Sequence, residues 1–381
     1  MEKTPYFSWK LGPLPKGCQL CIQGKKLVLF VTGLCPRKCF YCPISDKKSQ
    51  KDVIYANEWP IKENELETIF KEAELCGAKG AGITGGDPLV KLERTVTLIK
   101  NFKQRFGQHF HIHLYTSLNL ITEETLKHLY YSGLDEIRVH PDLDDRTLWP
   151  KISLLKKFSW DVGVEIPLIP TKEMETKKLI DLIQDKVDFL NINELEISDT
   201  NANHLVEKHF LPKDSMSYGV KGSGELGIEL LNYVEKNYPQ FNVHYCTTTL
   251  KDRVQLAERI KRRAKNIKEI FDVVTEEGML KRGAIYLPEI SPQTTRETLE
   301  KIKQNEKLAN QFLEKLDFLK KELLKKFHLT RTKIDVQKLR ILLSQKDVKR
   351  YAKEIKKLNL IPALVEEYPT HDGLEIEIEQ I

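Results

Sequence analysis

The sequence has little cysteine, 7 residues among 381, and no apolar run approaching the ~18 residues that a membrane span requires. Its first residues, MEKTPYFSWK, lack the basic and then apolar layout of a signal peptide. We therefore expect a cytoplasmic chain with no membrane segment, in a compartment that keeps thiols reduced. Cysteines that are scarce yet clustered there are expected to bind metal or to act in catalysis rather than to form disulfides.

Neither sign of charge dominates, because 61 Lys and Arg stand against 55 Asp and Glu, for a formal net charge of +6. This small excess requires no anionic partner, and binding to nucleic acid would need a localised basic patch. One helical segment offers a candidate, with an apolar stripe flanked by Arg253, Arg259, Lys261, Arg262, Arg263 and Lys265. That face is either ordinary solvated surface or a footprint for RNA or a phosphorylated substrate.

Three of the cysteines, Cys35, Cys39 and Cys42, are crowded into GLCPRKCFYCP at 33–43. A structural zinc ion normally needs four ligands, and a chance group of core cysteines does not suit a loop rich in Pro, Lys and Arg. Three thiolates that leave one iron of an iron–sulfur cluster open to a ligand fit better. The loop follows KLVLFVTG, an apolar, β-branched run that predicts a buried parallel strand. Ligand loops of parallel α/β folds lie at that end of the strand.

A second glycine-rich segment, GAGITGGDPLV, follows about fifty residues later. Here a short apolar strand ends in Gly85 and Gly86, followed by Asp87 and a helical pattern. Glycines at a strand end let the backbone approach a ligand closely and expose its carbonyls. Alone, Gly-Gly-Asp-Pro would be an ordinary turn, but its place after the cysteine loop favours a functional role.

The spacing Cys-x3-Cys-x2-Cys, with Tyr41 just before the last cysteine, resembles the radical S-adenosylmethionine (radical SAM) superfamily. The resemblance implies that the three cysteines hold a [4Fe-4S] cluster and that Tyr41 lies in the site for S-adenosylmethionine. It also implies that Gly85, Gly86 and Asp87 hold the amino group of that cofactor. The family more often has Glu where this chain has Asp87, a shortening that should not affect backbone contacts.

Strand patterns alternate with helical ones through the first 200 residues. Besides the two strands above, they are FHIHLYTS (110–117), DEIRVH (135–140), VGVEIPLI (162–169) and FLNINELEI (189–197). Six such units predict an α/β fold with a parallel sheet curled toward a barrel. The resemblance implies a partial TIM-type (β/α)6 barrel over residues 25–200.

Alternation along these strands assigns the side chains that face the barrel interior. A purely structural barrel would fill its interior with branched apolar residues. Here polar groups occur on four consecutive strands: His111, His113, Glu136, Glu165 and Asn191. They are predicted to line a substrate cavity. The alternative is that they are core residues with their hydrogen bonds satisfied, or residues at the barrel rim. From strand position alone, Arg138 is expected to pair with the cofactor carboxylate. Thr116 or Ser117 is expected to bind its carboxylate or ribose.

The remaining cysteines suggest a second site. Cys18 and Cys21 form a Cys-x2-Cys pair in GCQLC, and His244 and Cys246 are two apart in the expected strand VHYC. Because residues i and i+2 of a strand point the same way, these four would form a tetrahedral zinc site or hold a second iron–sulfur cluster. The alternative is a dithiol without a ligand, with Cys246, like Cys76, a buried core thiol.

We expect four segments along the chain. They are 1–24 with the Cys-x2-Cys pair, the barrel at 25–200, an extension at 201–290 with the His-x-Cys strand and the basic helix, and 291–381. The last segment is expected to hold one long helix over 294–327 and a small α+β appendage.

Five stretches, GCQLC, GLCPRKCFYCP, GAGITGGDPL, HIHLYTS and VHYCTTTLKD, together resemble an archaeal radical SAM family related to glycyl-radical-enzyme (pyruvate formate-lyase) activating enzymes. This resemblance implies an oxidoreductase that cleaves S-adenosylmethionine reductively to a 5′-deoxyadenosyl radical, which abstracts hydrogen. The electron donor would be a protein such as ferredoxin or flavodoxin. The substrate stays open between a protein, RNA and a small molecule. A non-catalytic iron–sulfur or zinc protein is a further alternative, disfavoured by the strand–loop placement.

Overall fold

The computed structural model describes residues 1–214, 218–329 and 331–381. The chain divides into two compact units, 1–259 and 260–381. This boundary differs from the predicted one near 290, because the strands at 273–286 pair with later strands rather than with the barrel. No helix in the described part of the chain is both long and apolar enough to cross a membrane.

The first unit is built on one sheet whose central strands are all parallel, in the order β11-β10-β9-β8-β7-β6-β3. In chain order they are β3 (Lys26–Phe30), β6 (Gly80–Thr84), β7 (His111–Ser117), β8 (Glu136–His140), β9 (Asp161–Leu168), β10 (Phe189–Glu194) and β11 (Asn242–Cys246). The predicted parallel sheet is confirmed. It has one strand more than predicted, because β11 continues the sheet with Asn191 paired to His244.

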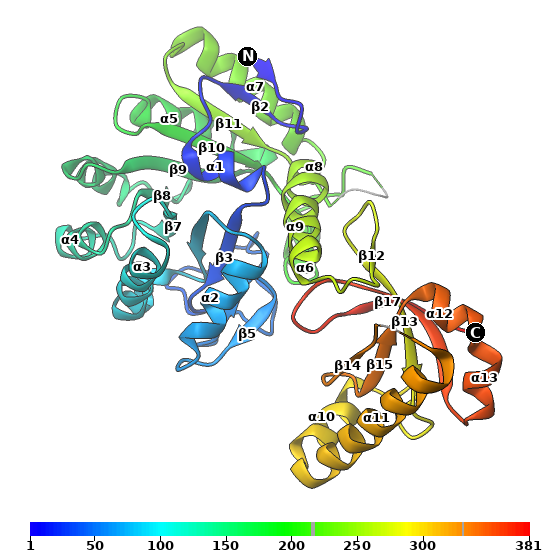
Figure 1. Cartoon of the computed structure of the whole chain (residues 1–381). Helices are drawn as coiled ribbons and strands as arrows, with labels where there is room; N and C mark the ends of the chain where they lie inside the picture. Colours follow the sequence, from blue (N-terminus) through cyan, green and yellow to red (C-terminus); the bar gives the residue numbers. More distant parts are fainter. Residues whose placement is uncertain (215–217, 330) are drawn as a thin grey trace. The chain divides into compact units, whose positions relative to one another are not determined.

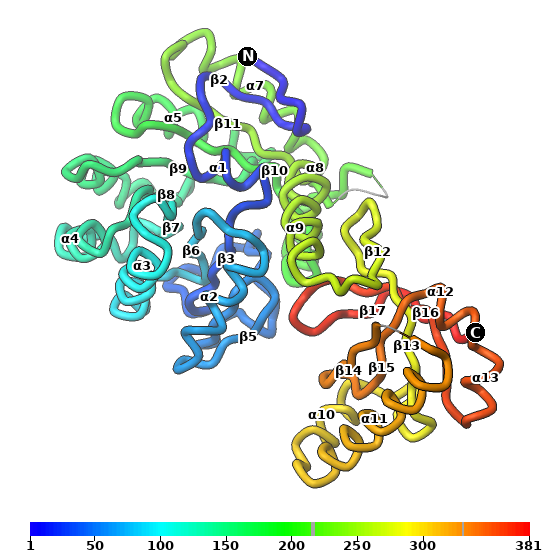
Figure 2. The backbone as a smooth tube through the Cα atoms, in the orientation of Figure 1, coloured from blue at the N-terminus to red at the C-terminus, as the bar shows by residue number. Residues whose placement is uncertain are grey.

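Antiparallel strands border this parallel core on both sides. β2 (Trp9–Leu11) pairs with β11 and β1 (Glu2–Lys3) pairs with β2, whereas β4 (Ile54–Ala56) and β5 (Trp59–Ile61) extend the sheet beyond β3. The tube in Figure 2 shows the N-terminal strands beside β11. The segment before the barrel is therefore part of the sheet.

Helices cover the outer face of the curved sheet, as Figure 1 shows for α3, α4 and α5. The helices of this unit are α1 (Lys16–Cys21), α2 (Leu66–Leu75), α3 (Leu92–Phe106), α4 (Glu123–Tyr131), α5 (Glu173–Ile183), α6 (Ala202–Glu207), α7 (Ser223–Asn237) and α8 (Thr248–Leu250). α9 (Ala257–Ile267) spans the unit boundary. Short 3-10 segments lie at Pro88–Lys91, Trp149–Lys157 and Pro170–Lys172, and a π-helical turn at Lys251–Leu256.

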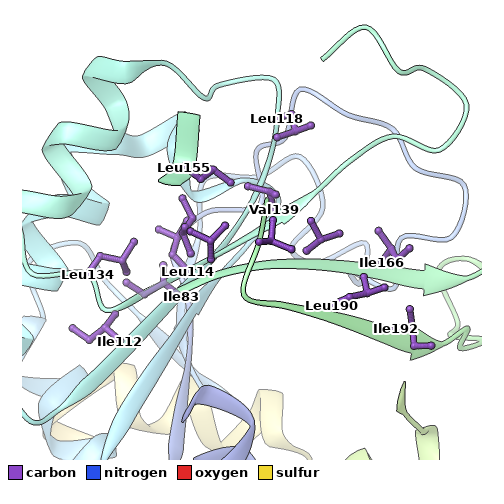
Figure 3. Close-up of a cluster of buried hydrophobic side chains, with 14 of the residues drawn as sticks. Ile83, Ile112, Leu114, Leu118, Leu134, Val139, Leu155, Ile166, Leu190 and Ile192 are labelled. Carbon is purple, nitrogen blue, oxygen red and sulfur yellow. The ribbon is translucent and has the colours of Figure 1, made fainter. Parts of the chain in front are cut away.

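The core between sheet and helices combines the outward-facing side chains of the parallel strands with apolar side chains of the helices and loops that cover them (Figure 3). Ile112, Leu114 and Val139 are fully buried there, on the face that alternation assigned to the helices. Local rules also hold: the Thr122 side chain caps α4, and Gly133 beyond its end takes a left-handed φ of 97°. The inner face of the sheet is thereby left for polar side chains.

The second unit is a small α+β structure. Its antiparallel sheet has the order β14-β15-β13-β16-β17, with β12 paired to β13. The strands are β12 (Val273–Val274), β13 (Leu280–Tyr286), β14 (Lys333–Asp335), β15 (Arg340–Leu343), β16 (Ile361–Glu367) and β17 (Glu375–Gln380), and the helices α10 (Arg296–Gln304), α11 (Glu306–Phe327), α12 (Gln345–Arg350) and α13 (Ala352–Lys357). The predicted single helix over 294–327 is interrupted at Asn305, whose non-helical backbone lets its side chain cap α11.

Candidate functional site

The loop with three cysteines begins at the carboxyl end of β3. The backbone N–H of Gly33 donates to Lys51 O at 2.8 Å, and Gln50 N–H donates to Gly33 O at 2.9 Å, which fixes the start of the loop. Cys42 N–H donates to Cys39 O at 3.1 Å, so the last two cysteines share one turn. All three thiols are partly exposed and can therefore be reached from outside.

The thiols of this loop influence one another. Burial raises the pKa of Cys35 to about 11, and the nearby Asp87, Cys39 and Cys42 act in the same direction. The backbone N–H of Arg37, 3.4 Å from Cys35 Sγ, opposes the rise. The proton therefore stays on the Cys35 thiol in this environment until a metal binds, since metal ligation requires a thiolate and releases the proton.

The Gly-Gly-Asp-Pro segment packs directly against the cysteine loop. Gly86 N–H donates to Thr32 O at 2.7 Å, and Asp87 N–H donates to Leu34 O at 2.8 Å. A Cβ atom on Gly86 would lie 2.4 Å from Leu34 O and 2.6 Å from Gly33 O. Only glycine therefore allows the two backbones to approach this closely.

Gly86→Ala is expected to reduce cluster retention and 5′-deoxyadenosine formation at least 10-fold, because the added methyl group must displace the backbone that begins the cysteine loop. The measurement is iron content and product per chain after anaerobic reconstitution. Gly224→Ala is the matched control, since its Cβ would meet only Tyr245 Oη, at 3.3 Å, within 3.4 Å. Equal iron and product in the two variants would show that the close approach is not needed.

The Asp87 carboxylate is fully engaged within the protein. It accepts hydrogen bonds from Thr116 Oγ1 at 2.8 Å, Ser117 Oγ at 2.7 Å, Ser117 N at 3.0 Å and Leu89 N at 3.0 Å. Thr116 and Ser117 each donate their hydroxyl proton to Asp87, so neither can donate it to a cofactor carboxylate. That part of the prediction is not supported, whereas acceptance of a bond from a ribose hydroxyl stays a prediction.

The lumen residues do come together, as a dense polar network. Arg138 is buried and donates to Glu136 through Nε and to Glu165 Oε2 at 2.7 Å through Nη1. Asn191 Nδ2 also donates to Glu165 Oε2, at 2.9 Å. Two protein carboxylates hold the guanidinium through Nε and Nη1, and the pairing of Arg138 with the cofactor carboxylate stays a prediction.

Helix α1 lies against this network on the inner side of the sheet. Gly17 N–H donates to Glu136 Oε2 at 3.1 Å, and a Cβ on Gly17 would lie 2.5 Å from Arg138 Nη2 and 2.6 Å from His113 Nδ1. The predicted residues thus line the lumen, but α1 packs against them where an open substrate cavity was expected. The sequence offered one indication of this close approach, the glycine that begins GCQLC.

One group in the described part of the chain brings three metal-ligand types together: ligand atoms of His111, Glu136 and Asp161 lie within 4.8 Å of one another. Lys26 Nζ lies 3.0 Å from Ala81 O, 2.8 Å from His111 O and 2.9 Å from His111 Nδ1. An ammonium donates one proton to each, so Nδ1 accepts and the neutral ring carries its proton on Nε2. Burial lowers the pKa of His111 to about 2, which keeps the ring neutral. This imidazole is not arranged to bind a metal.

The predicted tetrahedral zinc site is not formed. No three ligand atoms of Cys18, Cys21, His244 and Cys246, all of them described residues, lie within 4.8 Å of one another. Cys18 Sγ instead accepts from Asn191 Nδ2 at 3.3 Å, and His244 Nε2 lies 3.3 Å from Ser8 Oγ. Cys246 packs in a small apolar cluster with Ile22 and Leu250, among the neighbours expected of a core thiol.

Cys18→Ala is expected to leave the iron content at about four per chain, the content of a single [4Fe-4S] cluster. It should lower the free energy of unfolding by about 1–3 kcal/mol, because buried donors of Arg138 and Asn191 lose their acceptor. The measurements are iron and sulfide analysis and denaturant unfolding, with Cys42→Ala as the variant that should lose iron. A matching loss of iron from Cys18→Ala would show that this thiol is a ligand.

Two of the arginine side chains of the basic helix are buried within the protein. Arg259 is buried and donates to both oxygens of Glu58, and Arg263 is buried as well. Arg253 and Lys265 are exposed. Two of the six basic side chains are thus in the core, so the alternative of a footprint for RNA or a phosphorylated substrate loses Arg259 and Arg263.

Two residues that connect the cysteine loop to β8 were not among the predicted site residues. Arg37 lies within the loop itself, and His140 ends β8 on the same inward face as Arg138. Alternation along DEIRVH places His140 on the inward face with Glu136 and Arg138, since residues two apart point the same way, but it gives His140 no role. The partner of Arg37 could not be identified locally, because it lies more than one hundred residues away.

Comparison with known proteins agrees with this geometry. The profile of the family described as "Radical SAM superfamily" matches residues 29–162, which include the cysteine loop and the Gly-Gly-Asp-Pro segment. A protein of Methanocaldococcus jannaschii whose provisional name is glycyl-radical enzyme activating enzyme is 41% identical over 314 residues, 80% of this chain and 82% of that protein. The chain belongs to the radical SAM superfamily. The radical SAM assignment predicted from the cysteine spacing is confirmed.

Two further proteins are more distantly similar to this radical SAM enzyme. GTP 3′,8-cyclase of Clostridium perfringens is 24% identical over 213 residues, 55% of this chain and 62% of that protein. The crystal structure of Streptococcus suis SuiB bound to S-adenosylmethionine is 13% identical with a TM-score of 0.42, over 58% of this chain and 50% of that chain. The solved chain is thus matched over half of its length.

Membership of this superfamily implies a [4Fe-4S] cluster and S-adenosylmethionine as cofactors. The donor set fits the cluster: three partly exposed thiols on one loop provide three ligands and leave the fourth iron for the cofactor. The thiols that would hold it are Cys35, Cys39 and Cys42. The backbone of Gly85 and Gly86 lies against this loop and is predicted to meet the amino group of S-adenosylmethionine.

Proposed function

We propose that this radical SAM enzyme is an activating enzyme that removes one hydrogen atom from a glycine Cα of a protein partner. The observation that carries the proposal is the 41% identity, over 80% of the chain, to a protein provisionally named as such an activating enzyme. The cysteine loop at the carboxyl edge of the parallel strands supports it, because a site there can meet a segment of a partner.

In this proposal the cofactors supply the reactivity and the chain positions them. A bound cluster would supply one electron from a ferredoxin- or flavodoxin-type donor, so that S-adenosylmethionine could be cleaved to methionine and a 5′-deoxyadenosyl radical able to take a hydrogen atom from glycine. Cys35, Cys39 and Cys42 orient the cluster. Gly85 and Gly86 let the backbone approach the amino group of the cofactor, while Asp87 holds that segment to β7 through Ser117.

The lumen network would form the floor of this site. Arg138 pairs with both Glu136 and Glu165 beneath it, and α1 lies against them. A site closed on that side would limit the access of water to a radical. The geometry thus supports entry of the substrate from the edge that carries the cysteine loop.

The test is anaerobic reconstitution with iron and sulfide, followed by dithionite, S-adenosylmethionine and a candidate glycyl-radical protein labelled with Cα-deuterated glycine. We expect deuterium in the 5′-deoxyadenosine and a protein-based radical in the EPR spectrum. With unlabelled glycine the remaining α-hydrogen should split that signal into a doublet, and deuteration should collapse it. Formation of 5′-deoxyadenosine without deuterium transfer from any glycyl-radical protein tested would contradict the activating role but leave the radical SAM chemistry intact.

RNA as the substrate is less well supported. Of the six basic side chains that suggested it, Arg259 and Arg263 are buried, and Arg259 is paired to Glu58. Deuterium transfer from labelled RNA in the same assay would overturn this choice.

A further inference from the structure

The cysteine loop is fastened at two points to the carboxyl end of β8. Arg37, between Cys35 and Cys39, donates from Nη1 to the carbonyl oxygen of His140 at 2.9 Å and from Nη2 to Asp142 Oδ2 at 2.7 Å. Tyr41 Oη, between Cys39 and Cys42, lies 2.7 Å from His140 Nε2. His140 therefore contacts the loop on both sides of Cys39.

The contacts of His140 determine which atom donates in each bond. Nδ1 lies 2.8 Å from the carbonyl oxygen of Glu165 on β9, and a carbonyl can only accept, so Nδ1 carries the proton. Burial lowers the pKa of His140 to about 4, so the ring is neutral near pH 7 and Nε2 has a free lone pair. Tyr41 must then donate its hydroxyl proton to Nε2. Two hydrogen bonds thus connect Tyr41, through the His140 ring, to the backbone of β9.

We infer that His140 is a positioning residue that holds the cysteine loop in one arrangement relative to β8 and β9, through Tyr41 and Arg37. The bond to Tyr41 acts between Cys39 and Cys42, so its loss would free the backbone that sets the angle between their thiolates. The hydrogen bond that Arg37 donates to the carbonyl oxygen of His140 keeps its guanidinium beside the loop. A cation held there stabilises the more negative, reduced state of a bound cluster.

The surroundings of His140 leave room for the loop to move once this bond is lost. A cavity of about 90 Å³ borders the contacts between Arg37 and His140. It is lined by Arg37, Leu118, Asn119, His140, Asp142, Asp145 and Leu148. A polar cavity of that size can take water, which would replace the lost partner without fixing the loop. Asn201 Nδ2 donates to Tyr41 O at 3.0 Å and should keep the loop near its place. We therefore expect a change of geometry rather than loss of the cluster.

The test uses three variants of the full-length, reconstituted enzyme. Tyr41→Phe removes the hydroxyl donor. His140→Asn keeps a donor near the position of Nδ1 but removes Nε2, and His140→Gln places a polar atom near Nε2 but removes Nδ1. The readouts are iron content, the EPR spectrum and midpoint potential of the reduced cluster, and the rate and KM of S-adenosylmethionine cleavage.

We expect Tyr41→Phe and His140→Asn to retain wild-type iron while sharing one altered EPR spectrum and a cleavage rate lowered about 10-fold. His140→Gln should lie closer to the wild type. The double variant should be no worse than either single one, since both remove the same bond. An unchanged EPR spectrum and rate in Tyr41→Phe, or additive losses in the double variant, would overturn the inference. Should His140→Asn fail to fold, Tyr41→Phe decides alone, because its ring and packing are kept.

This inference depends on the cluster-binding role of the loop and not on the activating role. The two are separable, because the EPR spectrum and midpoint potential are measured without any protein partner. A wild-type enzyme that forms 5′-deoxyadenosine but activates no partner would leave the role of His140 to be decided by the variants alone.

Discussion

Cys39→Ala is expected to abolish both the visible absorbance of the iron–sulfur cluster and the release of 5′-deoxyadenosine. With two thiolates left, the loop can no longer supply three ligands to a cluster with one open iron. Because Cys39 is partly exposed, the fold should tolerate the change. The measurement is the absorbance spectrum and product analysis after anaerobic reconstitution with iron, sulfide, dithionite and S-adenosylmethionine.

The matched control is Cys76→Ala. Cys76 is buried in the core of the first unit, 1% exposed, and its thiol donates to Glu72 O at 3.0 Å. Its replacement should lower stability modestly and leave the absorbance and product of each folded chain unchanged. Wild-type product from Cys39→Ala, or a cluster lost from Cys76→Ala, would refute the assignment of ligands.

The second large effect is expected at Arg138. Arg138→Met should lower the free energy of unfolding by about 3–5 kcal/mol, because it leaves the carboxylates of Glu136 and Glu165 buried without their shared cation. Burial is the reason for this magnitude, since the guanidinium is 2% exposed and Glu136 is fully buried. Denaturant unfolding of the purified chain measures the change.

Two further variants distinguish the ion network from lost packing. Adding Glu136→Gln and Glu165→Gln to Arg138→Met should recover much of the loss, because neither carboxylate is then left without its shared cation. Arg105→Met removes an exposed partner of Glu74 and should leave the unfolding midpoint unchanged. An Arg138→Met chain as stable as Arg105→Met would show that the lumen charges are solvated.

Local sequence patterns were sufficient to predict the parallel strands and to indicate the cysteine loop as a ligand site. The β-branched run before Cys35 and the alternation along FHIHLYTS predicted buried parallel strands, since the side-chain period of a strand is two regardless of its partners. Cys35, Cys39 and Cys42 are close in sequence, so their spacing alone indicated a shared ligand. The Gly85–Gly86 pair was predicted from its place at a strand end after the cysteine loop and from the resemblance, and the close packing of Gly86 against Leu34 O is observed.

Predictions that depended on distant partners were less successful. Arg138 faces the lumen as predicted, but its Nε and Nη1 donate to the protein carboxylates of Glu136 and Glu165. Alternation assigns a side chain to a face, but it does not say what else occupies that face. The same limit applies to Thr116 and Ser117, whose hydroxyls were assigned to the cofactor and donate to Asp87 instead.

The sequence by itself indicated the family and the parallel α/β fold and predicted the three cluster cysteines, because cysteine spacing and the alternation along each strand are local patterns. Only the tertiary structure decided that α1 packs against the lumen network, that β11 adds a parallel strand and that the second unit begins at residue 260. It also decided that Cys18, Cys21, His244 and Cys246 do not form a tetrahedral site. These outcomes depend on backbone pairing and side-chain distances between segments far apart in sequence. Spacing along the chain does not constrain those distances.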